Sequence, residues 1–131
     1  MYFKDFESWI KVKKILNEEE RKVFIRAGEI RWVSFGVNVG SEIDGKGISF
    51  TRPALIIHVI GSNLALVIPM STKLKDDTVG YIEFEIQNKK VSLCLHQARI
   101  VSHKRILSRK GKISGDRLKE VKDKIKERFV N

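Results

Sequence analysis

The stretch PALIIHVIGSNLALVI, residues 53–68, contains two short apolar runs separated by the tripeptide GSN at residues 61–63. Each run is shorter than a typical helix and is bounded by turn-forming residues, which is typical of buried strands. Glycine and asparagine between the runs favour a turn, and Pro53 is tolerated because it opens its strand. The stretch therefore predicts a β-hairpin with strands over residues 53–60 and 64–68.

The segments around this hairpin predict three further strands. Residues 30–35 alternate between two faces, and residues 81–86 (YIEFEI) place an apolar side chain at every second position. Residues 91–96 (VSLCLH) follow a turn and repeat the same period. Residues 36–49 hold four glycines and few bulky side chains, which indicates a loop. Five short strands at close spacing predict a mainly β fold, either a small barrel or a strongly curved sheet.

Helical spacing occurs at both ends of the chain. Residues 2–16 repeat apolar side chains at intervals of three and four, which predicts an amphipathic helix with an aromatic face. We expect that face to lie on the barrel or on a second subunit. Asn17 followed by Glu20 has the form of a capping box, which predicts a second, short helix over residues 18–26.

The C-terminal segment also predicts a helix. Ser114 is a suitable cap for it, and its apolar positions are Leu118, Val121, Ile125 and Phe129. We therefore expect an N-terminal helical extension over residues 1–27 and one α+β barrel domain, with its closing helix, over residues 28–131.

The composition bounds the class of protein. The chain has 131 residues, of which 42% are hydrophobic, and this is about the length of one domain. No segment approaches the roughly 18 apolar residues of a membrane span, and the first residues lack the pattern of a signal peptide. The single cysteine, Cys94, rules out an intramolecular disulfide. We expect a cytoplasmic protein that is not bound to a membrane.

The net charge of +10 is unevenly distributed along the chain. Residues 100–131 carry eleven Lys and Arg against four Asp and Glu, so they hold most of the excess. Such a segment is either a solubilising surface or an electrostatic contact for a polyanion such as nucleic acid.

Several common sites are missing from the sequence. No GxxxxGK[ST] or GxGxxG motif follows a predicted strand, so nucleotide binding by those loops is excluded. The three histidines, His58, His96 and His103, do not lie at metal-ligand spacing beside carboxylates, so we expect no metal site and no cofactor.

The remaining motifs resemble those of the MazF/PemK family of toxin endoribonucleases. The closing segment KGKISGDRLKEVKDKI is similar to the last helix of that family, and residues 1–27 lie outside the resemblance. The five blocks that carry the resemblance follow one another in the family's order: GEIRWVSF (28–35), VGSE (39–42), TRPALII (51–57), VIPMST (67–72) and LHQARIVSHKRI (95–106).

The resemblance implies an SH3-like barrel of about five to seven strands, usually a homodimer, that cleaves single-stranded RNA without a metal. In such enzymes the ribose 2′-hydroxyl attacks the adjacent phosphorus, which leaves a 2′,3′-cyclic phosphate. The resemblance also implies a cognate antitoxin that lays an extended, often acidic segment over the RNA groove.

The resemblance assigns the catalytic role to Arg52, which matches the arginine of the family's Arg-Pro block. An arginine is suited to neutralise charge at the phosphorus, because its planar guanidinium can bind two phosphate oxygens at once and always carries a positive charge. Ser71 falls where the family carries a threonine, and Thr72 follows it, so either hydroxyl could bind the scissile phosphate. An exposed strand-entry arginine and ordinary polar strand ends are the alternative interpretations.

The resemblance assigns substrate contacts to five further residues. Glu42 matches a loop glutamate that borders the RNA groove, with a solvated carboxylate as the alternative. Gln97 and Arg99 match a block for which we expect backbone positioning or dimer contacts. Lys104 and Arg105 resemble the basic pair that follows, and a solvent-facing charge explains them equally well.

The sequence departs from the family at three places. His96 replaces an acidic residue that serves as the catalytic base in some members, and Ser41 replaces a histidine found in others. The loop from Glu42 to Arg52 is also longer than usual. If residues 91–96 form a strand, Cys94 and His96 point to the same side, and His96 could take over proton transfer, since histidine titrates near neutral pH.

Two other functions remain open from sequence alone. The replaced positions 41 and 96 are compatible with a non-catalytic barrel that binds nucleic acid or protein, because a fold does not fix a function. A thiol hydrolase built on Cys94 and His96 is the other alternative, although no third residue is evident and neighbours on one strand seldom give the required geometry.

Overall fold

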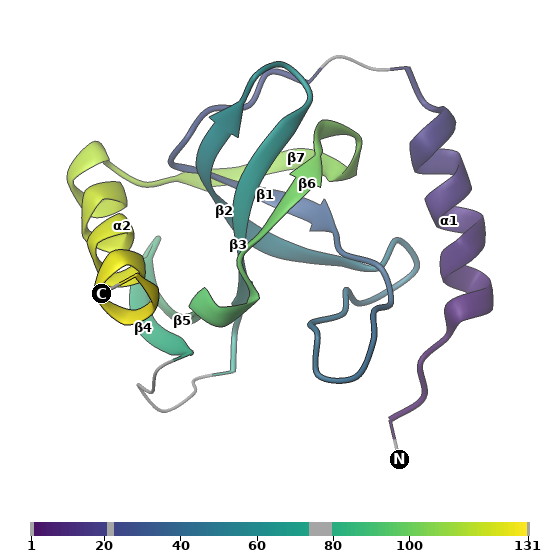
Figure 1. Cartoon of the computed structure of the whole chain (residues 1–131), viewed down its shortest axis with the longest axis horizontal. Helices are drawn as coiled ribbons and strands as arrows, with labels where there is room; N and C mark the ends of the chain where they lie inside the picture. The colour runs from purple at the N-terminus through teal and green to yellow at the C-terminus, as the bar shows by residue number, and fades with distance from the viewer. Residues whose placement is uncertain (1, 21–22, 74–79, 131) are drawn as a thin grey trace.

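The computed structural model describes residues 2–20, 23–73 and 80–130. A curved antiparallel sheet forms the body, and one helix lies at each end of it (Figure 1). The helices and strands are α1 (Phe6–Glu18), β1 (Glu29–Ser34), β2 (Thr51–Ile60), β3 (Leu64–Ser71), β4 (Tyr81–Ile86), β5 (Lys89–Cys94), β6 (Arg99–Ser102), β7 (Ile106–Lys112) and α2 (Gly115–Phe129), with 3-10 turns η1 (Leu95–Gln97) and η2 (His103–Arg105).

The hairpin predicted from residues 53–68 forms the middle of the sheet. The strands follow the order β4-β5-β3-β2-β1-β7, and β6 pairs with β3. Strands β2 and β3 pair from Ala54 with Pro69 to Ile60 with Leu64, and Gly61 makes the turn in the left-handed conformation that glycine tolerates. The prediction of this hairpin is confirmed, although both strands are longer than expected.

The middle of the hairpin is apolar because both of its faces are covered there. Leu55 and Ile57 point into a cluster beneath the β4–β5 hairpin and α2, whereas Ala54 and Ile56 point into a second cluster on the other face. Successive side chains of a strand point to opposite faces, so a strand with two buried faces needs a continuous apolar run. Val121 of α2 belongs to the first cluster and is fully buried.

The mainly β fold of seven strands with a C-terminal helix is confirmed, but the sheet is not closed into a complete barrel. Its order begins at β4 and ends at β7, and no ladder joins these two strands in the described part of the chain. A side chain spans the gap instead, since the Gln87 amide donates to the Lys110 carbonyl oxygen at 3.3 Å.

The N-terminal helix is shorter than predicted. Helix α1 begins at Phe6 rather than at residue 2, because the Asp5 carboxylate accepts from the Ser8 amide at 3.0 Å and caps the first turn. None of the helices in the described residues is long and apolar enough to cross a membrane.

The predicted second helix over residues 18–26 is wrong for residues 19–20 and 23–26, which are extended or irregular; residues 21 and 22 lie outside the described residues. Tertiary contacts outweigh the capping-box signal here. The Phe24 carbonyl accepts from Arg31 Nη2 at 2.7 Å, and the Arg26 amide donates to Glu29 at 2.8 Å. These bonds hold the segment against β1 instead of leaving its backbone groups for a helix.

The last strands differ in detail from the prediction. Strand β5 ends at Cys94, and its side chains from Ser92 to Cys94 are all buried because β5 lies between β3 and β4. The turn η1 follows, so His96 is not on a strand. Strands β6 and β7 were not expected, whereas the Ser114 cap is confirmed by its bond from the Arg117 amide at 3.3 Å.

Candidate functional site

Arg52 lines one cleft of about 260 Å³ together with Ser71 and Thr72, which lie far from it in sequence. Arg52 is the second residue of β2 and Ser71 is the last of β3, so the pairing of these two strands brings them to the same edge. Trp32 of β1 and Lys46 of the following loop complete the polar and aromatic walls. The structure thus brings together three of the four predicted catalytic residues.

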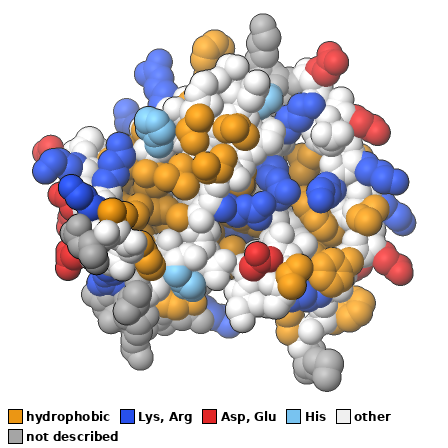
Figure 2. Space-filling model, viewed as in Figure 1, with side chains coloured by type: hydrophobic (Ala, Val, Ile, Leu, Met, Phe, Trp, Pro, Cys, Tyr) orange, Lys and Arg blue, Asp and Glu red, His pale blue; other side chains and the backbone are white. Residues whose placement is uncertain are grey.

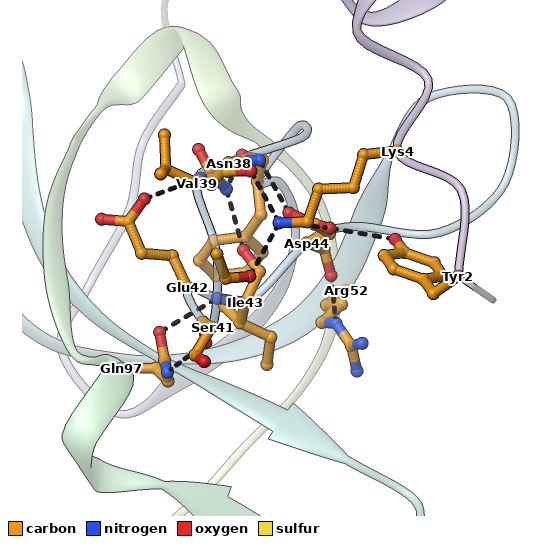
Figure 3. Close-up of polar contacts among 12 residues, drawn as sticks. Tyr2, Lys4, Asn38, Val39, Ser41, Glu42, Ile43, Asp44, Arg52 and Gln97 are labelled. Carbon is orange, nitrogen blue, oxygen red and sulfur yellow. Dashed lines mark hydrogen bonds and ion pairs between the residues drawn. The ribbon is translucent and has the colours of Figure 1, made fainter.

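The loop 36–49 holds the Arg52 side chain. Arg52 Nε donates to the backbone carbonyl oxygen of Asp44, and its terminal nitrogens extend away from that loop (Figure 3). The Asp44 carboxylate is buried and accepts from the Asn38 amide at 2.7 Å and from the Tyr2 hydroxyl at 2.9 Å. Lys4 Nζ lies 3.3 Å from the same carboxylate.

A second cleft of about 550 Å³ contains Glu42, His96, Gln97 and Arg99. The loop 36–49 lies between the two clefts, since its residues 38–43 line the second and its residues 46–47 line the first. The predicted RNA-binding residues on this side therefore lie together, but in a cleft separate from that of Arg52.

Gln97 fixes this loop rather than pointing into the solvent. Its Oε1 accepts from the Ile43 amide at 3.0 Å, and its Nε2 donates to the Ser41 carbonyl at 3.1 Å. Both groups of the side-chain amide are therefore used within the protein. Glu42 likewise accepts from the Val39 amide of its own loop at 2.9 Å.

His96 lies on η1, and its ring is held from two sides. Its Nδ1 is 2.8 Å from the Gly80 carbonyl oxygen, and its ring meets Tyr81 edge to face at 4.7 Å. A carbonyl only accepts, so Nδ1 carries the proton and Nε2 of the neutral ring keeps a lone pair. The ring is exposed to solvent.

The arrangement expected of Cys94 and His96 side by side on one strand is wrong, because β5 ends at Cys94. The Cys94 side chain is 2% exposed, so its thiol cannot reach a substrate in this conformation. Among the described residues, no group of three or more His, Cys, Asp or Glu side chains is placed to hold a metal ion.

Lys104 and Arg105 contact the protein itself, under helix α1. Lys104 Nζ donates to the Asn17 carbonyl at 2.6 Å, and Arg105 Nη1 donates to the carbonyls of Ser34 and Phe35 at 3.2 Å each. Burial, together with the nearby positive charge of Arg99, lowers the pKa of Arg105. These two residues are not brought together with Arg52.

Sequence reasoning missed three residues that shape the site. Trp32 is 36% exposed beside Arg52, and the Lys110 ammonium lies 5.2 Å from the centre of its ring. The sequence signal that could have identified Trp32 was a large aromatic residue in a strand whose other side chains mostly face the core. Asp44 and Lys46 lie in the glycine-rich loop, where nothing in the sequence distinguished them from solvated charges.

One face of the molecule combines positive charge with apolar surface. Figure 2 shows a band of Lys and Arg side chains across the middle of the view, next to a broad area of hydrophobic side chains. Leu64 on β3 and Ile100 on β6 are among the exposed apolar residues, at 41% and 54%. Such a surface is suited to contact with a polyanion and with another protein.

The fold is that of known bacterial toxins. A MazF crystal structure from Deinococcus radiodurans superposes with a TM-score of 0.60 at 17% identity, over 80% of this chain and 96% of that chain. The toxin MazF-mt6 of Mycobacterium tuberculosis superposes with a TM-score of 0.56 at 11% identity, over 78% and 96%. A search of curated protein sequences gave no match.

The fold is thus that of the small β-sheet proteins of the MazF class. Residues 26–129 match the family described as "PemK-like, MazF-like toxin of type II toxin-antitoxin system", and the chain belongs to this family.

Proposed function

We propose that this toxin is an endoribonuclease that cleaves single-stranded RNA by attack of the ribose 2′-hydroxyl on the adjacent phosphorus, without a metal. The observation that carries the proposal is the convergence of Arg52, Ser71 and Thr72 on one cleft, with the Arg52 Nε held by a backbone carbonyl. That bond leaves the two terminal nitrogens of the guanidinium, which form a planar pair suited to a phosphate.

In the proposed reaction, the 2′-oxygen forms a bond to phosphorus while the bond from phosphorus to the 5′-oxygen breaks. Arg52 neutralises the charge on the phosphorane, and the hydroxyls of Ser71 and Thr72 donate to its oxygens. One proton leaves the 2′-hydroxyl and one reaches the departing 5′-oxygen. The products are a 2′,3′-cyclic phosphate and a 5′-hydroxyl.

His96 is the proposed proton-transfer group, because the lone pair on its Nε2 is directed away from the Gly80 carbonyl that fixes the ring. It lies in the second cleft, which shares no lining residue with the cleft of Arg52, so this role requires RNA binding to bring the ring within hydrogen-bond reach of the phosphate at Arg52. A single strand of RNA would run from the second cleft along loop 36–49 to Arg52. Glu42 and Arg99 would line this path, and Trp32 offers a ring on which a base could stack.

Gln97 has a positioning role in this proposal, because both groups of its amide hold the loop. Lys104 and Arg105, which were expected to bind RNA, are assigned instead to the contact with α1, where Lys104 binds Asn17 and Arg105 lies over the Trp9 ring.

The proposed partners follow from the family and from the charge. A type II toxin has a cognate antitoxin, and an extended acidic segment would complement a chain of net charge +10. We further propose that the toxin acts as a homodimer in the cytoplasm. The exposed apolar side chains of β3 and β6, together with the unpaired edge of β6 in the described residues, support an interface there.

The test is cleavage of a single-stranded RNA in the presence of EDTA, followed by analysis of the new ends. Cyclic phosphate ends and retained activity support the proposal, and an absolute need for magnesium contradicts it. An Arg52→Ala protein that binds RNA but no longer cleaves it distinguishes the enzyme from a non-catalytic RNA-binding protein. Wild-type protein that binds RNA without cleaving it would favour the latter.

A further inference from the structure

The N-terminal segment before α1 binds loop 36–49 at several points (Figure 3). The Tyr2 hydroxyl donates to Asp44 Oδ2 at 2.9 Å, and Lys4 Nζ lies 3.3 Å from the same oxygen. Lys4 Nζ also donates to the carbonyls of Asn38 at 2.6 Å and Gly40 at 2.9 Å. This segment lies outside residues 26–129, which match the toxin family.

Asp44 connects this segment to Arg52. Its side chain accepts from Tyr2 and ion-pairs with Lys4, while its backbone carbonyl accepts from Arg52 Nε. Asp44 is 7% exposed, and a buried carboxylate needs hydrogen-bond and ion-pair partners to replace the water it has lost. The bonds to its carboxylate from Tyr2 and Lys4 therefore contribute to the placement of the Asp44 backbone.

The opposite side of the same loop is anchored independently. Gln97 holds the backbone of Ser41 and Ile43 from η1. The Asp44 end is bound within the loop as well, since the Gly45 amide donates to the Gly36 carbonyl at 2.8 Å and the Asn38 side-chain amide donates to the Ile43 carbonyl at 2.8 Å. Tyr2 and Lys4 add the contacts that reach this end from outside the loop.

We propose that Tyr2 and Lys4 are positioning residues for Arg52 and act through Asp44. They hold the carbonyl that binds Arg52 Nε, and this orients the terminal nitrogens of the guanidinium toward the cleft. The inference rests on the proposed ribonuclease function for its catalytic consequence, but the structural link can be measured without RNA. A misplacement of about 1 Å in a reacting group can slow a reaction by ~10²-fold.

The experiment compares Tyr2→Phe, Lys4→Met and the double variant with the wild type. Phenylalanine removes only the hydroxyl, and methionine keeps most of the lysine's length without its charge. Lys14→Met, at an exposed position on helix α1, is the control for loss of one charge. Helix α1 is held separately by the buried Trp9, so the helix should stay docked in every variant. Trp9 fluorescence monitors this in a Trp32→Phe background, because the chain has two tryptophans.

Two measurements are made on each protein. The first is the exchange rate of the Arg52 Nε proton by NMR, which reports the bond to Asp44 directly. The second is kcat and KM for cleavage of single-stranded RNA. We expect faster exchange and a kcat lowered by about 10- to 10²-fold in the double variant, with little change in KM. Lys4→Arg should recover part of the rate, and Lys14→Met should match the wild type.

A double-mutant cycle separates positioning from general stability. In an Arg52→Lys background, which keeps a measurable rate but lacks the Nε bond to Asp44, the Tyr2 and Lys4 changes should have no further effect on kcat, because the bond that they support is gone. An equal loss in both backgrounds would overturn the inference.

The outcomes distinguish this inference from the proposed function. Unchanged exchange of the Arg52 Nε proton in the double variant overturns the link, whether or not RNA is cleaved. Faster exchange in a protein whose wild type cleaves no RNA supports the link and contradicts the ribonuclease. Faster exchange with an unaltered kcat overturns the catalytic part of the inference.

Discussion

The Arg105 guanidinium lies 5.5 Å from the centre of the Trp9 ring, and this pair joins the body of the sheet to helix α1. The same guanidinium donates to the carbonyls of Ser34 and Phe35 at the end of β1. Trp9 also meets the ring of Phe50 edge to face at 5.7 Å. One anchor of the N-terminal extension is therefore a buried aromatic side chain that rests on a half-buried cation.

Replacing Trp9 should release α1. Trp9→Ala is expected to lower the free energy of unfolding by about 3 kcal/mol, the lower end for loss of a buried tryptophan, because the neighbouring half-buried groups can partly collapse. Chemical denaturation checks this value. Ile10→Ala, at a mostly exposed position on the same helix, should change it by about 0.5 kcal/mol or less.

Gly36 offers an independent check of the same contact. A Cβ atom at this position would lie 2.2 Å from the Trp9 ring, and the backbone has a φ of +77°. Gly36→Ala should therefore displace Trp9 and lower the free energy of unfolding. Gly47 has a similar φ of +76° but open space around it, so Gly47→Ala measures the cost of the backbone conformation alone. Equal effects of the two changes would show that Trp9 does not pack as described.

The fork of the Arg52 guanidinium should be required for cleavage. Arg52→Lys keeps the charge but loses both the Nε bond to Asp44 and the planar pair of nitrogens. We expect kcat to fall by ~10²-fold, the order seen when one transition-state donor is removed. Arg26→Lys, at an exposed position outside both clefts, is the control. A lysine variant with full activity would mean that Arg52 supplies only generic charge.

Removing the His96 imidazole should slow cleavage and alter its pH dependence. If Nε2 transfers a proton, His96→Ala should reduce kcat by about 10²- to 10⁴-fold and remove one limb of the pH–rate profile. His96→Asp, which restores the acidic residue of the family, should recover part of the rate. His103→Ala is the matched control, since His103 Nδ1 also lies near a carbonyl, that of Asn63, at 3.3 Å. A wild-type profile for His96→Ala would falsify this role.

Glu29 should make stability fall at low pH. Although burial opposes its ionised form, hydrogen bonds from the Arg26 amide and from Arg31, with Arg109 nearby, lower the pKa of Glu29. A lowered folded-state pKa means that the charged form stabilises the native state above the usual glutamate range, about pH 4.3. That stability is lost as the pH falls through the lower folded value.

The corresponding variant is Glu29→Gln. It should cost about 1–2 kcal/mol of unfolding free energy near pH 7, the worth of a buried charge-assisted hydrogen bond. The difference from the wild type should shrink as the pH falls through the lowered folded-state pKa of Glu29, below which both side chains are neutral. Thermal or urea unfolding across this range measures it, and Glu83→Gln, whose pair with Lys90 is exposed, should show little effect at any pH. A constant difference across pH would contradict the linkage.

The exposed edge of β6 should mediate self-association. Ile100→Glu places a charge on the 54% exposed apolar side chain and is expected to shift the protein from dimer to monomer in light scattering. Ile48→Glu, on an even more exposed loop residue, should leave the assembly unchanged. A wild-type protein that is monomeric at high concentration would remove the proposed interface.

The sequence by itself determined the parts of the fold whose pattern is local. The continuous apolar runs of residues 53–68 predicted the central hairpin because both faces of β2 and β3 are buried. The alternation in residues 81–86 predicted β4 at its observed bounds, and Ser114 was correctly identified as the cap of α2. Arg52 and the hydroxyls of Ser71 and Thr72 were found as one group from their motifs.

Only the tertiary structure decided the features that depend on distant partners. The segment before β1 is extended because Arg31 and Glu29 bind its backbone, and both side chains are held in place by β7, through the Leu107 carbonyl and Arg109. The sequence predicted Lys104 and Arg105 to be cations on the surface, but in the structure both bind backbone carbonyl oxygens beneath α1. The link from Tyr2 and Lys4 through Asp44 to Arg52 spans about fifty residues of chain. Hydrogen bonds of this kind have no period in sequence, because they form only where the packed sheet brings the groups together.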